Sequence, residues 1–109
     1  MAISNRDVFH AVADPIRREI LELLATHNMP VHELAGQFSV SRPAISTHLR
    51  VLREAGLVAE HKSGRERVYS LIPGPLREVR LWIAYFDPFW DLRLKHLKTH
   101  PDKRTEREL

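Results

Sequence analysis

The chain of 109 residues contains no cysteine, and this absence excludes disulfide bridges, thiolate metal sites and cysteine nucleophiles. Only four glycines are present, and they form no glycine-rich phosphate-binding loop. No segment approaches the ~18 consecutive apolar residues of a membrane span, and the N-terminal residues lack the apolar core of a signal peptide. We therefore expect a protein of the reducing cytoplasm with no membrane partner.

The patterns of enzyme active sites are missing as well. The sequence shows no ordered set of serine, histidine and aspartate, and no paired carboxylates in a pocket-forming context. We expect a protein that is not an enzyme and that uses no cofactor. With 43% hydrophobic residues, a chain of this length is expected to form one domain with a modest core, which a partner subunit would complete.

Positive charge is only slightly in excess, with 17 Lys and Arg against 14 Asp and Glu. A surplus of +3 is too small to indicate nucleic-acid binding by itself. Its distribution is more informative, because residues 42–67 hold six cationic side chains and three acidic ones. The cations are Arg42, Arg50, Arg53, Lys62, Arg65 and Arg67, and the acids are Glu54, Glu60 and Glu66.

Residues 41–58 combine a capped helix start, an apolar stripe and a basic stripe. Ser41 can cap the helix, Pro43 suits its first turn, where a missing backbone N–H costs nothing, and Gly56 ends it. At ~100° per residue, apolar and polar residues fall on adjoining faces. The apolar residues are Ile45, Leu49 and Leu52, and the polar ones are Arg42, Ser46, Arg50 and Arg53. Short or cationic side chains near the start of a free face are typical of a DNA recognition helix.

Three shorter helices are predicted before this one. Ser4 can cap a first helix that ends near residues 14–15, and Asp14 can cap a second helix that runs to about His27. After a linker at residues 28–30, the helical spacing of Val31, Leu34, Ala35 and Phe38 predicts a third helix. A turn at residues 39–40 then leads to Ser41, so the order is helix, turn, helix.

A β-hairpin is predicted after Gly56, with strands Leu57–His61 and Glu66–Leu71 and a loop at residues 62–65. Gly64 supplies the positive φ that such a turn needs. Lys62 and Arg65 are expected at the tip, where a winged module contacts the phosphate backbone of DNA.

Residues from Pro75 to about Lys98 are predicted to be helical again, with Pro88 bending or splitting the helix. Aromatic residues at helical spacing favour a subunit interface, and a small organic-ligand pocket between two copies of this helix is the alternative. The predicted dimer interface combines two residues of the first helix with apolar residues of this last helix: Phe9, Val12, Trp82, Phe86, Phe89, Trp90, Leu94 and Leu97. The polar tail, residues 101–109, is expected to fray.

Taken together, these motifs resemble the ArsR/SmtB type of bacterial winged-helix repressors. Asp14–Leu24 is similar to the family's second helix, residues 41–58 to its recognition helix and Gly64–Leu71 to its wing. The resemblance implies a mainly α fold with a small β-hairpin, a winged helix-turn-helix of order ααααββα, as one domain over residues 1–100 that dimerises through its terminal helices. It also implies a homodimer that binds an inverted-repeat operator in double-stranded DNA and represses transcription, commonly at its own promoter.

The metal ligands of that family are absent here. Pro30 and His32 stand where the arsenic and cadmium sensors carry Cys-x-Cys, and Asp87 is not followed by the histidine of the zinc sensors. The chain therefore resembles the subgroup without a metal motif. His96 and His100 have a spacing that suits one metal ion, but no motif supplies further ligands, so we predict no metal site and no response to metals.

The predicted DNA contacts are Ser41, Arg42, Pro43, Ser46, Thr47, His48, Arg50, Lys62, Arg65 and Arg67. His48 lies beside the apolar stripe, so we expect it to pack or to contact phosphate and not to act as a switch. A protein-interaction module is the alternative function, because winged helices also serve as docking domains. Such a module would carry exposed apolar anchors on the recognition face, whereas this face carries arginine and hydroxyl groups.

Overall fold

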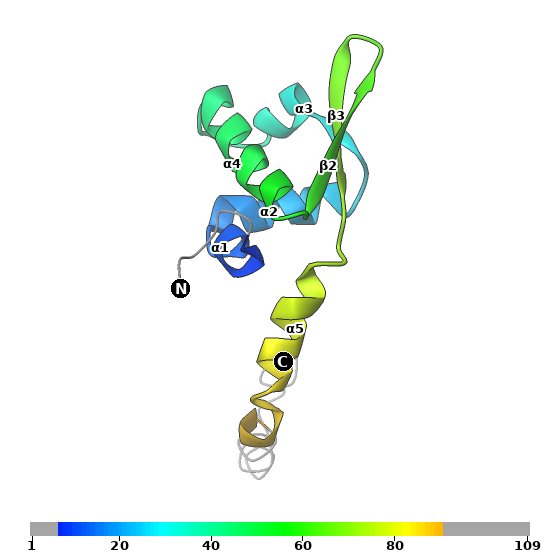
Figure 1. The fold of residues 1–109 in the computed structure, drawn as a ribbon. Helices are drawn as coiled ribbons and strands as arrows, with labels where there is room; N and C mark the ends of the chain where they lie inside the picture. Colours follow the sequence, from blue (N-terminus) through cyan, green and yellow to red (C-terminus); the bar gives the residue numbers. More distant parts are fainter. Residues whose placement is uncertain (1–6, 91–109) are drawn as a thin grey trace. The chain divides into compact units, whose positions relative to one another are not determined.

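The computed structural model describes residues 7–90. The chain forms two compact units, Met1–Val79 and Arg80–Leu109. The first unit contains, in order, α1 (Val8–Val12), α2 (Pro15–Leu24), β1 (Met29–Pro30), α3 (Val31–Ala35), α4 (Arg42–Glu54), β2 (Val58–Ser63) and β3 (Glu66–Leu71) (Figure 1). Helix α5 (Leu76–Ala84) begins in the first unit and ends in the second. The expectation of one domain over residues 1–100 stays a prediction.

The helix starts follow from local side-chain caps. The Asp14 carboxylate accepts a hydrogen bond from the Arg17 N–H at 3.0 Å and caps α2, as predicted, with Pro15 in the first turn. The predicted cap of α1 was wrong, because Asp7 and not Ser4 precedes the helix and accepts from the Phe9 N–H at 2.8 Å. Helix α2 also ends earlier than predicted, at Leu24.

A third strand was not predicted from the sequence. Residues 28–30 were expected to be a linker, but β1 pairs antiparallel with β3, with Met29 opposite Tyr69 and Pro30 opposite Val68. The sheet order is β1-β3-β2. A strand of two residues is too short to show an alternating pattern, so only its pairing with a distant segment defines it.

The hairpin has a tighter turn than predicted. Strand β2 continues to Ser63, which pairs with Glu66, so the turn consists of Gly64 and Arg65 alone. Gly64 has the expected positive φ, at 63°. Lys62 therefore lies in the strand opposite Arg67 and not in the loop.

The core of the first unit is formed by the faces that the helical spacing indicated. Ile45, Leu49 and Leu52 of α4 are buried, and α3 and α2 pack against this helix. Gly56, with φ at 78°, ends α4, and the Leu57 N–H donates to the Leu52 carbonyl at 2.9 Å. The recognition helix is thus anchored by one face and leaves the opposite face open.

The second unit shows where α5 is interrupted. The helix ends at Ala84, a turn follows at residues 85–86, and helical backbone resumes at residues 87–90. The Trp90 N–H donates to the Phe86 carbonyl at 3.1 Å, and Pro88, which has no N–H, lies in the first turn of the new segment. The helix is therefore split, one of the two forms expected. None of the helices in residues 7–90 has the length and apolar character that crossing a bilayer requires.

Candidate nucleic-acid interface

Helix α4 presents a free polar face over its first two turns. The Ser41 hydroxyl accepts from the Ala44 N–H at 3.3 Å and caps the helix, as predicted. Ser46 and Arg50 are exposed, while Ile45 and Leu49 on the opposite face are buried. The predicted contacts on this helix and its cap are exposed except for His48: Ser41, Arg42, Pro43, Ser46, Thr47 and Arg50.

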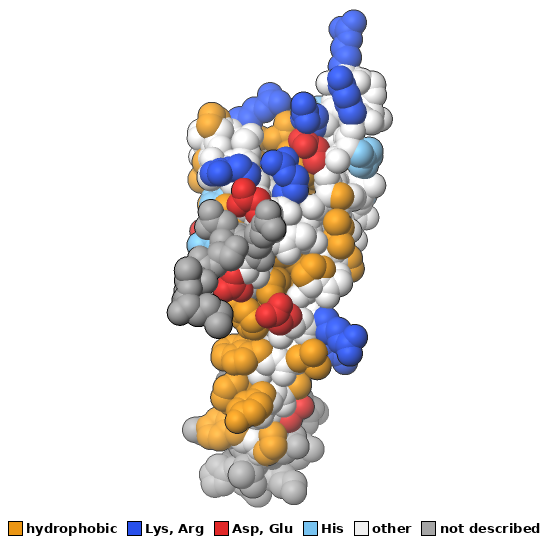
Figure 2. Space-filling view, viewed as in Figure 1, with side chains coloured by type: hydrophobic (Ala, Val, Ile, Leu, Met, Phe, Trp, Pro, Cys, Tyr) orange, Lys and Arg blue, Asp and Glu red, His pale blue; other side chains and the backbone are white. Residues whose placement is uncertain are grey.

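The hairpin carries the second group of cations. Lys62, Arg65 and Arg67 are all exposed, with Arg65 in the two-residue turn. Figure 2 shows Lys and Arg side chains gathered around the start of α4 and along the hairpin. The first unit thus brings the predicted helix and wing cations to one surface, as backbone contacts on both sides of a groove would require.

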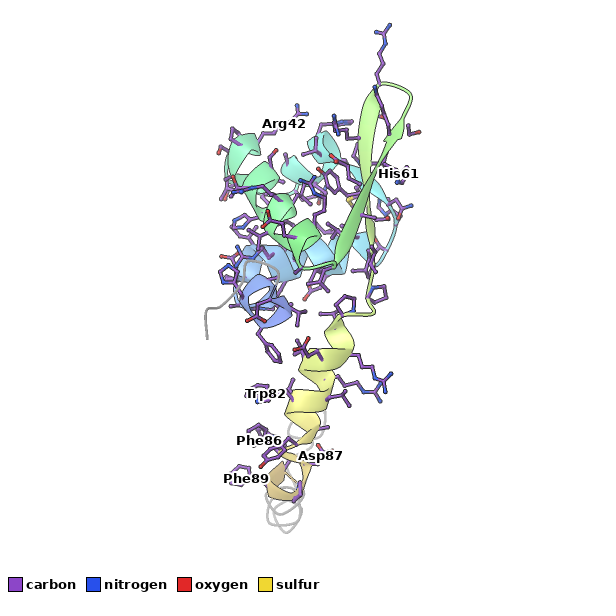
Figure 3. The ribbon with its side chains drawn as sticks, in the orientation of Figure 1. Arg42, His61, Trp82, Phe86, Asp87 and Phe89 are labelled. Atoms are coloured by element: carbon purple, nitrogen blue, oxygen red, sulfur yellow. The ribbon has the colours of Figure 1, made fainter. Side chains whose placement is uncertain are left out.

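A shallow groove of about 290 Å³ connects the recognition helix to the wing. It is lined by Pro30, Val31, His32, Arg42, Arg65, Glu66 and Arg67. His32 Nδ1 lies 3.4 Å from Glu66 Oε2 across it. Arg42, at the end of α4 nearest the hairpin tip (Figure 3), shares this groove with the wing arginines, although 23 residues separate it from Arg65 in the sequence.

Glu60 ties the recognition helix to the wing, a role that the sequence pattern did not indicate. Its Oε1 lies 3.2 Å from Arg53 Nη1 of α4 and 3.3 Å from Arg67 Nη1 of β3. The Tyr69 hydroxyl donates to Glu60 Oε2 at 2.7 Å. This hydrogen bond is the largest cause that holds the pKa of Glu60 below its ordinary value, and the charges of Arg67 and Arg53 lower that pKa as well. Burial acts in the opposite direction and is outweighed. Burial and the bond to Glu60 raise the pKa of Tyr69.

His48 differs from the other predicted contacts because it already has partners within the protein. Its side chain is 18% exposed, and its Nδ1 lies 3.1 Å from Arg17 Nη1 and 3.9 Å from Asp14 Oδ2. Burial raises the pKa of Asp14, but the Arg17 N–H bond and the charges of His48 and Arg17 outweigh it and lower that pKa overall. The structure thus shows the packing role for His48, and its DNA contact stays a prediction.

The predicted interface residues divide between the two units. Phe9 and Val12 are half-buried and pack on the core of the first unit. In the second unit, Trp82 is 57% and Trp90 44% exposed, and Phe86 and Phe89 are exposed as well. The Trp82 and Phe86 rings meet edge to face at 5.4 Å. Figure 3 labels Trp82, Phe86 and Phe89 on one side of this segment. Leu94, Leu97, His96 and His100 lie outside the described residues.

Helices α1 to α4 are followed by a cationic hairpin, and α4 bears a free basic face. This arrangement defines a winged helix-turn-helix protein that binds DNA. Residues 14–60 match the family model described as "Bacterial regulatory protein, arsR family". The chain is 38% identical over 80 residues to the transcriptional repressor SdpR of Bacillus subtilis, covering 73% of this chain and 89% of that protein. It is 45% identical over 82 residues to the HTH-type transcriptional regulator Rv2034 of Mycobacterium tuberculosis, covering 75% of this chain and 74% of that protein.

A solved structure agrees with this assignment. The fold matches the homodimeric winged helix-turn-helix DNA-binding domain of Mb0332 from Mycobacterium bovis, a possible ArsR-family regulator. The TM-score is 0.60 at 27% identity, over 73% of this chain and 75% of that domain. The chain belongs to the ArsR family. It is a DNA-binding transcriptional regulator and not an enzyme, and the predicted winged-helix fold is confirmed.

Proposed function

We propose that the protein is a homodimeric repressor that binds an inverted-repeat operator with two copies of α4 and of the hairpin. The observation that carries this proposal is the exposed face of α4, with Arg42, Ser46 and Arg50, beside the wing cation Arg65. Helix α4 would enter the major groove with its N-terminal residues toward the bases, and the wing would contact phosphates. The printed name of SdpR, a transcriptional repressor, supports repression as the outcome.

The homodimer rests on the exposed aromatic surface of the second unit. Trp82, Phe89 and Trp90 expose about half of their surface, and a contiguous apolar patch of this kind marks an interaction site. The related Mb0332 domain is described as homodimeric. A twofold dimer with two recognition helices matches an operator with two half-sites, about 10 base pairs apart centre to centre or a near multiple. Autoregulation at the protein's own promoter and a cytoplasmic location belong to the same proposal.

DNA binding is tested by titrating the protein against its own promoter and against scrambled DNA at several salt concentrations. We expect Arg42→Ala to cost ~1–3 kcal/mol on the operator and to relax base preference, because it removes a side chain at the base-reading end of α4. Arg65→Ala should weaken binding to both DNAs alike and flatten the salt dependence, because a phosphate contact releases counterions. Arg77→Ala on α5 removes the same charge elsewhere and serves as the control.

The same titration also tests independence from metals. We propose that zinc, cadmium, arsenite or a chelator changes the operator affinity by no more than about twofold, well below the ~1–3 kcal/mol of an allosteric coupling. A tenfold metal-induced loss of affinity that disappears in His96→Ala would contradict this part of the proposal. A wild-type protein that binds its promoter no better than scrambled DNA would contradict the whole.

A further inference from the structure

The guanidinium of Arg17 connects three helices of the first unit. Its Nε donates to the Ala11 carbonyl at 2.8 Å and its Nη2 donates to the His10 carbonyl at 3.0 Å, both on α1. Both oxygens belong to the last turn of the helix, and the His10 carbonyl also accepts from the N–H of the C-cap residue Ala13 at 3.2 Å. The remaining arm, Nη1, points to His48 Nδ1 of the recognition helix at 3.1 Å.

The chemistry of arginine sets the direction of this contact. A guanidinium has only donors, so in this hydrogen bond His48 Nδ1 is the acceptor. Asp14 Oδ2 lies 3.9 Å from the same Nδ1 atom, farther than a hydrogen bond. Arg17, and not Asp14, is the hydrogen-bonding partner of His48.

We propose that Arg17 is a positioning residue for operator binding, which holds the recognition helix at a fixed place relative to α1 through its contact with His48. This rests on the proposed function, in which α1 belongs to the dimer interface and α4 enters the DNA. In a twofold dimer, the distance between the two recognition helices is fixed only if each α4 is firmly attached to its own interface helix. The Arg17 guanidinium is such an attachment, since it bonds to both helices.

Arg18 provides a matched control for the experiment. Its Nη1 donates to the Val12 carbonyl at 2.8 Å, so it also joins α2 to α1, but it does not contact His48. We expect Arg17→Gln to lower the affinity for the two-half-site operator about tenfold, while Arg18→Gln keeps it. Arg17→Gln should also lose less affinity than wild type when the spacer between half-sites is changed by ~2 base pairs, because its recognition helices are held less firmly. Melting temperature and molar mass of both variants show that fold and assembly persist.

The outcomes separate this proposal from the one on which it rests. A wild-type protein with operator preference, but with Arg17→Gln and Arg18→Gln equally impaired or equally unimpaired, would overturn the positioning role alone. A wild-type protein without operator preference would overturn the proposed function, and the positioning role with it.

Discussion

Glu60 shows how a single carboxylate can set the relation between two parts of a binding surface. It accepts from Tyr69 and pairs with Arg53 of α4 and Arg67 of β3, and its side chain is only 17% exposed. The carboxylate therefore holds Arg53 and Arg67 in fixed positions relative to each other. Charge-assisted bonds of this kind are stronger than neutral ones, so the carboxylate contributes to the stability of the first unit.

Removal of this carboxylate should reduce stability in a pH-dependent way. We expect Glu60→Gln to lower the free energy of unfolding by about 1.5–3 kcal/mol at pH 7, since hydrogen bonds to charged groups contribute that much. The folded state lowers the pKa of Glu60 below its ordinary value of 4.5. Its contribution is therefore fully present above the unfolded-state pKa and is lost as pH falls through the folded-state pKa, below 4.5. Urea unfolding at neutral and acidic pH measures the difference.

The exposed Glu54 of α4 serves as the control for this experiment. Glu54→Gln should change the free energy of unfolding by less than about 0.5 kcal/mol at either pH, as is usual for a surface position. A Glu60→Gln variant whose deficit persists undiminished at acidic pH would show that the loss does not come from the carboxylate charge.

At the level of elements, the hairpin depends on one backbone conformation. Its two-residue turn contains Gly64 with φ at 63°, a region that residues with a Cβ atom adopt at a cost. A Cβ added at Gly64 would meet nothing within 4 Å, so that cost is conformational and not steric. Gly74, in the connection to α5, has equal space but no positive φ.

We therefore expect Gly64→Ala to destabilise the first unit by about 1 kcal/mol and Gly74→Ala to leave it nearly unchanged. Thermal and urea unfolding of the two variants check this. The hairpin cations of Gly64→Ala should also bind DNA phosphate less firmly, which a salt titration on scrambled DNA detects. Equal stability of both variants would mean that the turn rearranges to another type at no cost.

On the scale of the whole molecule, assembly and DNA binding should fail together. Trp90→Asp places a charge in the exposed aromatic surface, where burial against a second copy would desolvate it. We expect this variant to be monomeric and to lose operator binding, because one recognition helix reaches only one half-site. Light scattering and a gel shift on the same sample test the two effects. Arg77→Asp is the control, because it places an acidic side chain on α5 at an exposed position outside the aromatic surface.

An unchanged dimer in the Trp90→Asp variant would contradict this prediction and would assign Trp90 a role within its own chain. A monomer that still prefers the full operator over a single half-site would contradict the link between assembly and recognition. The dimer interface through the terminal helices stays a prediction until then, since part of it lies beyond residue 90.

The sequence alone determined those features that depend on neighbouring residues. The caps Asp14 and Ser41, the end of α4 at Gly56 and its buried stripe with Ile45 and Leu49 were all predicted, because capping and helical periodicity act within a few residues. The same locality explains why the predicted DNA-contact residues of α4 are exposed, because they occupy the face that remains once the core face is assigned. A local pattern can still favour the wrong residue of two nearby candidates, since the N-cap of α1 is Asp7 and not Ser4.

Only the tertiary structure decided which distant residues become partners. His48 bonds to Arg17, Glu60 joins Arg53 to Arg67, Met29 pairs with Tyr69, and Arg42 shares a groove with the wing. A polar residue on a helix face has many possible partners of suitable chemistry, and its own spacing does not choose among them. The choice is made by the packing of α2, α4 and the sheet around a common core, which brings together atoms that lie dozens of residues apart in the chain.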